Sequence, residues 1–109
     1  MKDLAKLFNQ IQKMQEKLKE VKEELGNRVV EASAGGDMVV VKMNCKNELI
    51  SIKIKKEVVN PDDVEMLEDL IMAAINEARR KAAEIVSEEL SKMSAGINIP
   101  GLDDFINLS

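Results

Sequence analysis

The sequence lacks several residue types on which catalysis and base stacking depend. It contains no histidine, tryptophan or tyrosine and only two phenylalanines. Histidine is the commonest general base and metal ligand near neutral pH, so we expect no catalytic residue, cofactor, metal site or small-molecule substrate. Proteins usually hold single-stranded nucleic acid by stacking its bases on aromatic rings. The shortage of such rings therefore makes a duplex the more suitable nucleic-acid partner.

Cysteine and long apolar runs are also scarce. The single cysteine, Cys45, excludes an intramolecular disulfide, and no signal-peptide pattern opens the chain. We interpret Cys45 as a small buried hydrophobe, since no histidine is present to activate it. No apolar stretch approaches the ~20 residues of a membrane span. These features predict a cytoplasmic protein with no membrane partner.

Two local patterns that resemble chemical sites are better explained by turns and helix ends. The Gly35-Gly36 pair precedes a strand candidate and no Lys-Ser/Thr follows it, so it indicates a hairpin turn and not a phosphate loop. The acidic residues between positions 62 and 69 lie at the expected start of a helix, where the helix dipole favours negative charge. Neither pattern supports an enzyme.

The most regular feature is an apolar repeat in the first 25 residues, with alternating spacings of three and four. Its members are Leu4, Leu7, Ile11, Met14, Leu18, Val21 and Leu25. This rhythm is typical of a coiled-coil seam, which requires a partner helix along its length. A thin aliphatic core combined with such a seam favours oligomerisation. The sequence leaves open whether the partner helix comes from the same chain or from another copy.

Changes of periodicity divide the chain into one α+β domain, residues 1–109, of order α-β-β-β-α. We expect a first helix (1–26) capped by Gly26-Asn27, a sheet region (27–59), a second helix (60–94) and an irregular apolar tail (95–109). The three strand candidates are 28–33, 38–44 and 49–59, which predict an antiparallel three-stranded meander flanked by two long helices.

Alternation and helix-start signals predict the faces and ends of these elements. Val39, Val41 and Met43 share one face of the second strand, and Ile50, Ile52 and Ile54 share one face of the third. The opposite face of the third strand carries Ser51, Lys53 and Lys55. Asn60 is the expected cap of the second helix and Pro61 its first residue.

The net charge of −4 is unevenly distributed. Residues 1–25 carry +1, residues 26–60 carry +2, residues 61–95 carry −5, and the tail from residue 96 carries −2. Any contact with a polyanion must therefore be local.

The first helix offers the best candidate surface for such a contact. Lys2, Lys6, Lys13 and Lys17 fall close to one line off the seam, with Asn9 and Gln10 between them, so they can face outward while the seam is buried. Lysines and amides suit contacts with the phosphate backbone. An ordinary solvated helix face is the alternative interpretation. Arg79-Arg80-Lys81 forms a second basic group, which Glu77 and Glu84 can neutralise.

Taken in order, several segments resemble the YbaB/EbfC family of bacterial nucleoid-associated proteins. They are residues 14–18, the glycine turn before residues 38–44, residues 65–71 leading into 73–78, Ser94-Ala95-Gly96, and Ile99-Pro100-Gly101. The resemblance covers essentially the whole chain. It implies a small homodimer of tweezer-like shape, located in the nucleoid, that binds double-stranded DNA with little sequence preference and influences its organisation and gene expression.

The resemblance does not define a set of binding residues, so we assign them by charge. The predicted DNA-contacting residues are Lys2, Lys6, Gln10, Lys13, Lys17, Arg79 and Arg80. The alternative hypothesis is a coiled-coil protein-interaction module without direct DNA contact, which the acidic second helix favours.

Overall fold

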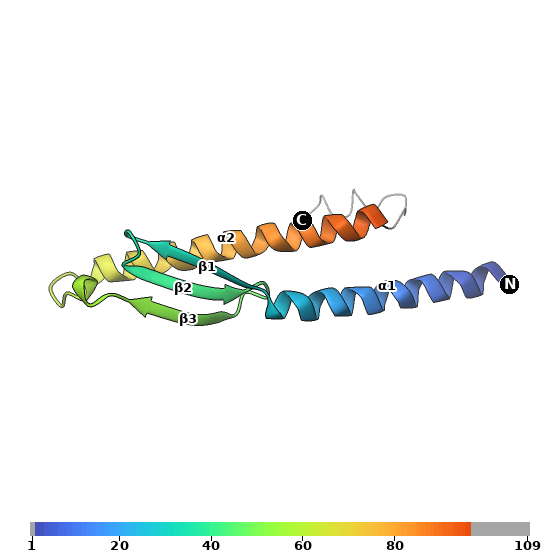
Figure 1. Cartoon of the computed structure of the whole chain (residues 1–109), viewed down its shortest axis with the longest axis horizontal. Helices are drawn as coiled ribbons and strands as arrows, with labels where there is room; N and C mark the ends of the chain where they lie inside the picture. Colours follow the sequence, from blue (N-terminus) through green and yellow to red (C-terminus); the bar gives the residue numbers. More distant parts are fainter. Residues whose placement is uncertain (1, 97–109) are drawn as a thin grey trace.

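The computed structural model describes residues 2–96 and has two long helices beside a small sheet (Figure 1). The elements are α1 (Lys2–Asn27), β1 (Val29–Ala34), β2 (Val39–Asn44), β3 (Leu49–Ile54), a 3-10 helix (Lys56–Val58) and α2 (Val64–Gly96). The predicted α-β-β-β-α order is confirmed. The predicted apolar tail lies outside the described residues from position 97 onward.

The strands form the predicted antiparallel meander in the order β1-β2-β3. Ala32 pairs with Val41, and Val41 pairs with Ile52, so the three side chains share one face of the sheet. The register of β2 against β3 shifts between Lys42 and Met43.

The connection between β2 and β3 is organised by Asn44, which is buried. Its side-chain Oδ1 accepts hydrogen bonds from the backbone N–H groups of Lys46 (2.9 Å) and Glu48 (3.0 Å), and its Nδ2 donates to Glu48 Oε1 (3.0 Å). Asn47 supplies the left-handed backbone of this turn, with φ of 63°. Asn44 thus satisfies its own polar atoms and those of the turn that it closes.

The core lies between α2 and the first two strands. Ala74, Ala78 and Ala82 recur every four residues along α2 and are fully buried, so a column of small side chains lets the helix approach the sheet closely. Val39 and Val41 are the largest completely buried side chains opposite this column. The helix packs across β1 and β2 and scarcely reaches β3.

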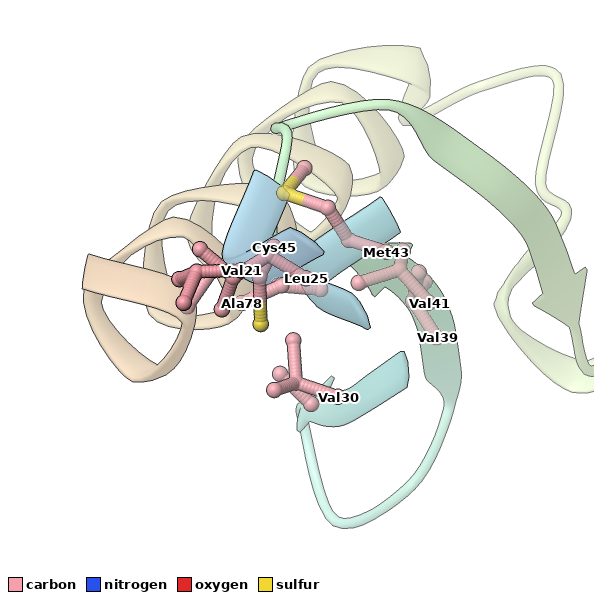
Figure 2. Close-up of a cluster of buried hydrophobic side chains, with 11 residues drawn as sticks. Val21, Leu25, Val30, Val39, Val41, Met43, Cys45 and Ala78 are labelled. Carbon is pink, nitrogen blue, oxygen red and sulfur yellow. The ribbon is translucent and has the colours of Figure 1, made fainter. Parts of the chain in front are cut away.

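The end of α1 is fastened to the same core. Val21, Leu25 and Cys45 gather beside Ala78 in one cluster (Figure 2). The backbone N–H of Cys45 donates to the carbonyl oxygens of Leu25 and Arg28, both at 3.1 Å. The C-terminal part of α1 is therefore fixed to β2, and the rest of the helix projects away from the sheet (Figure 1).

Two predicted boundaries differ from the structure. The strand predicted to reach residue 59 ends at Ile54, because the chain turns into a 3-10 helix that buries Val58. The second helix begins at Val64 and not at residue 60. Asn60 accepts a hydrogen bond from the Asp62 N–H at 3.0 Å in a turn, and Asp63 Oδ1 accepts from the Met66 N–H at 3.3 Å as the cap.

The glycine at the end of α1 has a different role from the predicted one. The helix continues through Gly26 to Asn27, and neither residue has a positive φ. A Cβ atom added to Gly26 would lie 3.0 Å from the Cε atom of Lys46. Gly26 therefore allows the β2–β3 connection to lie against the helix.

Candidate nucleic-acid interface

The basic line predicted on α1 lies on a solvent-exposed surface of the projecting helix. Lys6, Gln10, Lys13 and Lys17 are all exposed, and none of them makes a side-chain hydrogen bond or ion pair that the described residues reveal. The side chain of Lys2 lies outside the described residues. We call the five residues 2, 6, 10, 13 and 17 the basic stripe.

The seam of α1 is buried over only part of its length. Val21 and Leu25 are buried, and Met14 and Leu18 are half-buried. The seam members Leu4, Leu7 and Ile11 are exposed at 57%, 51% and 40%, and Phe8, which neighbours the seam, is exposed at 60%. We call these four the distal row. The sequence predicts a partner along the whole seam. The chain's own core covers only the C-terminal half of the seam.

The arginines of α2 are exposed, but they differ in their partners. Arg80 Nη2 lies 2.6 Å from Glu77 Oε1, and Arg80 Nη1 lies 2.5 Å from Glu84 Oε1. The hydrogen bond from Arg80 lowers the pKa of Glu77, and the same bond raises the pKa of Arg80. The charge of Arg80 is thus matched locally by two carboxylates. Arg79 points about 100° away around the helix and forms no ion pair within the described part of the chain.

The side of α2 next to β1 is fastened to that strand. Lys81 Nζ donates to the backbone carbonyl oxygen of Glu31 at 2.8 Å, and Arg28 Nη1 lies 3.2 Å from Glu89 Oε1. A lysine at the rim of an outer strand hinders another strand from pairing there. The sequence placed Lys81 only in a basic group, because its spacing from Glu31 gives no local signal of this contact.

The outer strand β3, on the other edge of the sheet from β1, carries apolar side chains that α2 does not cover. The sequence analysis missed this surface. Ile50, Ile52 and Ile54 of β3 are 53%, 40% and 39% exposed, although Ile52 and Ile54 pair with the fully buried Val41 and Val39. Alternation predicted their shared face but not its exposure, which arises because α2 lies over β1 and β2.

The α2 helix also carries exposed apolar side chains. Val64 and Met72 are exposed, and by helical spacing they lie, with half-buried Ile75, on the flank of α2 away from Lys81. We call the β3 isoleucines with Val64, Met72 and Ile75 the β3 surface. Apolar area of this kind on both a strand and a helix is typical of a protein interface.

The other face of the sheet is polar, as predicted. Lys42, Lys53 and Lys55 are exposed there, and a shallow hollow over this face is lined by Ser33, Val40 and Lys53 among others. Glu31 and Asp37 lie at the same hollow, so its charge is mixed.

No chemical centre is evident in the described residues. Cys45 is buried, and this burial raises the pKa of its thiol, while the Arg28 charge acts weakly in the opposite direction. A protonated, enclosed thiol is a poor nucleophile, in agreement with the predicted structural role. Within residues 2–96, no group of three or more acidic or cysteine side chains is placed to hold a metal ion. Neither helix in that range has the length and apolar character needed to cross a bilayer.

Comparison with known proteins identifies the family. The model of the YbaB/EbfC DNA-binding family matches residues 1–97. The chain belongs to the YbaB/EbfC DNA-binding family. The resemblance that the sequence segments indicated is therefore confirmed, and the family is one of nucleoid-associated, DNA-binding proteins.

Curated relatives and a solved structure agree with this assignment. The chain is 53% identical over 100 residues to a nucleoid-associated protein of Alkaliphilus metalliredigens, covering 92% of this chain and 88% of the relative. It is 48% identical to a nucleoid-associated protein of Pelotomaculum thermopropionicum, covering 92% and 95%. The crystal structure of the uncharacterized protein HP0035 from Helicobacter pylori has the same fold, with a TM-score of 0.73 at 22% identity over 80% of this chain and 91% of that one.

Proposed function

We propose that this YbaB/EbfC chain binds duplex DNA as a homodimer, through contacts of the basic stripe with phosphates. The observation that carries the proposal is the exposure of Lys6, Gln10, Lys13 and Lys17 along one line of a helix that projects from the sheet. Contacts of lysine and amide groups with the backbone carry no base information. The binding is therefore of low sequence preference and alters the organisation of DNA in the bacterial nucleoid, within the cytoplasm.

The β3 surface is the proposed dimer interface. It is apolar, it belongs to an outer strand, and the corresponding rim of β1 is occupied by Lys81. Two copies related by a twofold axis would each present the same isoleucines and methionine to the other, as an isologous interface requires. Burial of these side chains supplies a hydrophobic contribution that a thin aliphatic core lacks.

Pairing through β3 makes weak charges effective together. Each α1 carries only a few unpaired lysines, and an isolated set of this size binds DNA weakly. A dimer presents two stripes at a fixed separation, so the second stripe binds at the effective concentration set by the first. Two projecting helices would then grip or bridge a duplex in the tweezer-like manner that the family resemblance implies.

The α2 arginines contribute unequally to the proposed surface. Arg79 is exposed and carries an unmatched charge, whereas Arg80 must leave Glu77 and Glu84 before it meets a phosphate. We therefore expect Arg79 to contribute more than Arg80 to the free energy of DNA binding. We further infer that the protein is not an enzyme and acts without a cofactor or small-molecule substrate.

The second candidate function is a protein-interaction module without DNA contact. The observation that favours it is charge: α2 carries seven acidic residues against four basic ones, and the whole chain carries −4. The α1 helix would then present its distal row to another polypeptide.

Charge reversal on α1 separates the two functions. We expect Lys6→Glu with Lys13→Glu to weaken binding to a random-sequence duplex by about tenfold or more, because two phosphate contacts become repulsive. Fluorescence anisotropy at two salt concentrations measures this. For the wild type with about four to eight phosphate contacts, the slope of log K against log salt is about −4 to −7.

Lys19→Glu with Lys22→Glu is the matched control, since it makes the same charge change on the same helix but off the basic stripe. We expect a loss below about threefold, from the general change of charge alone. Light scattering must show an unchanged dimer for both variants. Equal losses of DNA affinity for the two variants, or a wild-type affinity that does not change with salt concentration, would contradict the proposal and favour the protein-interaction module.

A further inference from the structure

The distal row of α1 is an apolar surface that nothing within residues 2–96 covers. Its four members are exposed on a helix whose other end is buried in the core. In Figure 1, α1 continues well past the end of α2, so that helix does not reach the row. Four large apolar side chains grouped among charged and amide side chains mark an interaction surface.

The spacing of the row identifies a helix as its occupant. Leu4, Leu7, Ile11 and Met14 keep the alternation of three and four up to the tip of α1. Such a narrow row is matched by a second helix with the same repeat. The central apolar side of α2 is already packed in the chain's own core, where Ala74, Ala78 and Ala82 are buried. A second copy of α1 supplies the matching repeat.

Two copies of the row fit together antiparallel in a register that uses all four seam positions. In this register Leu4 faces the partner's Met14, and Leu7 faces the partner's Ile11. Because the arrangement is twofold symmetric, each contact occurs twice. Phe8 lies beside the partner's Phe8 across the twofold axis, which covers the most exposed side chain of the row.

The charges that flank the seam favour this direction over the parallel one. In the antiparallel register, Asp3 lies beside the partner's Lys17 at both ends of the contact. A parallel pair in register places Lys17 against the partner's Lys22, also twice. Asp3 and Lys17 are exposed and make no ion pair among the described residues, so both are available. Opposite charges therefore meet only in the antiparallel arrangement.

We propose that the distal row of α1 binds the distal row of a second copy in this antiparallel register, so that two molecules join at their tips. Since α1 projects away from the sheet (Figure 1), the two sheets lie at opposite ends of the joined pair. The tip contact is therefore distinct from the β3 surface. A chain with two isologous interfaces, one at β3 and one at the tip, joins dimers into longer chains.

The tip contact is weak in dilute solution and acts where the protein is concentrated. Residues 4–14 of two helices bury less than the ~1,200 Å² of a standard interface. Dimers that lie close together on one duplex reach the effective concentration that such a contact needs. Lys6 and Lys13 each follow a seam residue by two positions, about 160° around the helix, so they stay free to contact phosphates. Linkage of neighbouring dimers on DNA is a consequence that rests on the proposed function.

Disulfide formation between two cysteine variants tests the contact without DNA. Leu4→Cys and Met14→Cys are each made together with Ile50→Asp, which disrupts the β3 surface, and are mixed and oxidised in the high-micromolar range. We expect the mixed disulfide to exceed either same-variant disulfide by about tenfold. In the proposed register, position 4 faces position 14 of the partner, whereas the two copies of position 4 lie about 15 Å apart along the helix axis. The native Cys45 is buried and does not compete.

Gln12→Cys in place of Met14→Cys is the matched control. Gln12 is exposed, and it lies only two residues away but off the seam. We expect its mixed disulfide with Leu4→Cys to form at least about fivefold less. Equal yields for positions 12 and 14, or a dominant disulfide between two copies of position 4, overturn the proposal.

Charge exchange tests the register independently. When both cysteine proteins carry Asp3→Lys, or both carry Lys17→Asp, like charges meet at both ends, and we expect the mixed yield to fall about threefold at low salt. When the first carries Asp3→Lys and the second Lys17→Asp, opposite charges meet again, and the yield must recover. Lys19→Asp in both is the control, exposed and off the seam, with less than half of the loss on a logarithmic scale. Failure of the recovery overturns the register.

The consequence for DNA is tested by removing part of the row. Leu7→Ser with Ile11→Ser leaves the basic stripe intact, so we expect affinity for a short duplex that holds one dimer to stay within about twofold. On a long duplex we expect cooperative binding by the wild type and a Hill coefficient of about 1 for the variant. Equal cooperativity overturns the linkage of dimers. If neither protein binds DNA, the proposed function fails, while the disulfide yields still decide the tip contact.

Discussion

The turn between β1 and β2 shows how much one residue position can constrain this small fold. Gly35 and Gly36 have φ of 63°, and Asp37 has φ of 67°, so three consecutive residues adopt the left-handed conformation. Their surroundings differ, however. A Cβ atom on Gly35 would lie 2.8 Å from Leu70 Cδ2, whereas one on Gly36 would meet nothing within 4 Å. The turn is therefore fitted to α2 at Gly35 and open to solvent at Gly36.

Gly35→Ala and Gly36→Ala separate backbone strain from steric contact. Both substitutions place a Cβ at the same φ, which costs about 1 kcal/mol or more. Only Gly35→Ala also displaces Leu70, so we expect it to lower the free energy of unfolding by about 1 kcal/mol more than Gly36→Ala does. Urea denaturation of the two variants measures the difference. Equal losses would mean that Leu70 moves aside freely.

Burial and pairing at single residues also depend on distant parts of the chain. Arg80 has carboxylates three residues before it and four residues after it, a pattern that the sequence already displays. Lys81 and Arg28 instead find partners on β1 and α2 that lie far away in sequence. Only the local pairs were predictable.

At the scale of elements, the sheet is covered asymmetrically. The alanine column of α2 packs over β1 and β2, while no other element within residues 2–96 covers the exposed isoleucines or the outer rim of β3. Strand alternation placed Ile52 and Ile54 on one face, and their pairing with Val41 and Val39 agrees with this, whereas the register shift falls at Ile50. Alternation along β3 contained no information on which strands α2 covers. That coverage depends on the small side chains of α2, which is a different element.

Ile50→Asp tests the role of β3 in pairing. Ile50 is the most exposed of the three isoleucines, so the folded chain tolerates the change, whereas a buried carboxylate in an interface is strongly unfavourable. We expect a monomer by analytical ultracentrifugation at micromolar concentration, with unchanged helix content by circular dichroism. Val29→Asp, on the other outer strand at 50% exposure, should remain dimeric. Two dimeric variants would place the interface elsewhere.

At the scale of the whole molecule, the projecting α1 makes the chain long and thin. The described part measures 73 × 24 × 16 Å, with α1 extending beyond the sheet and α2 (Figure 1). The projecting part of α1 adds little to the hydrophobic core, but it presents a helix surface far from that core. In a dimer, two such helices determine the spacing of the two basic stripes, and avidity follows from that spacing.

The Ile50→Asp monomer therefore gives a prediction for DNA binding as well. With one basic stripe in place of two, we expect affinity for a long duplex to fall about 100-fold and the salt slope to fall to about half. Anisotropy titrations at several salt concentrations measure both quantities, with Val29→Asp as the control. A monomer that binds as tightly as the wild type would show that the two stripes do not act together.

The sequence alone determined the element order, the strand faces, the structural role of Cys45 and the family, because these follow from local periodicity and from segments read in order. It also located the basic stripe, since residues three and four apart share a helix face regardless of what the helix packs against. Tertiary structure decided the rest. It moved the start of α2 to Val64, buried Val21 and Leu25 while leaving Leu4 exposed, and uncovered β3, because each of these depends on contacts between residues that are far apart in the chain.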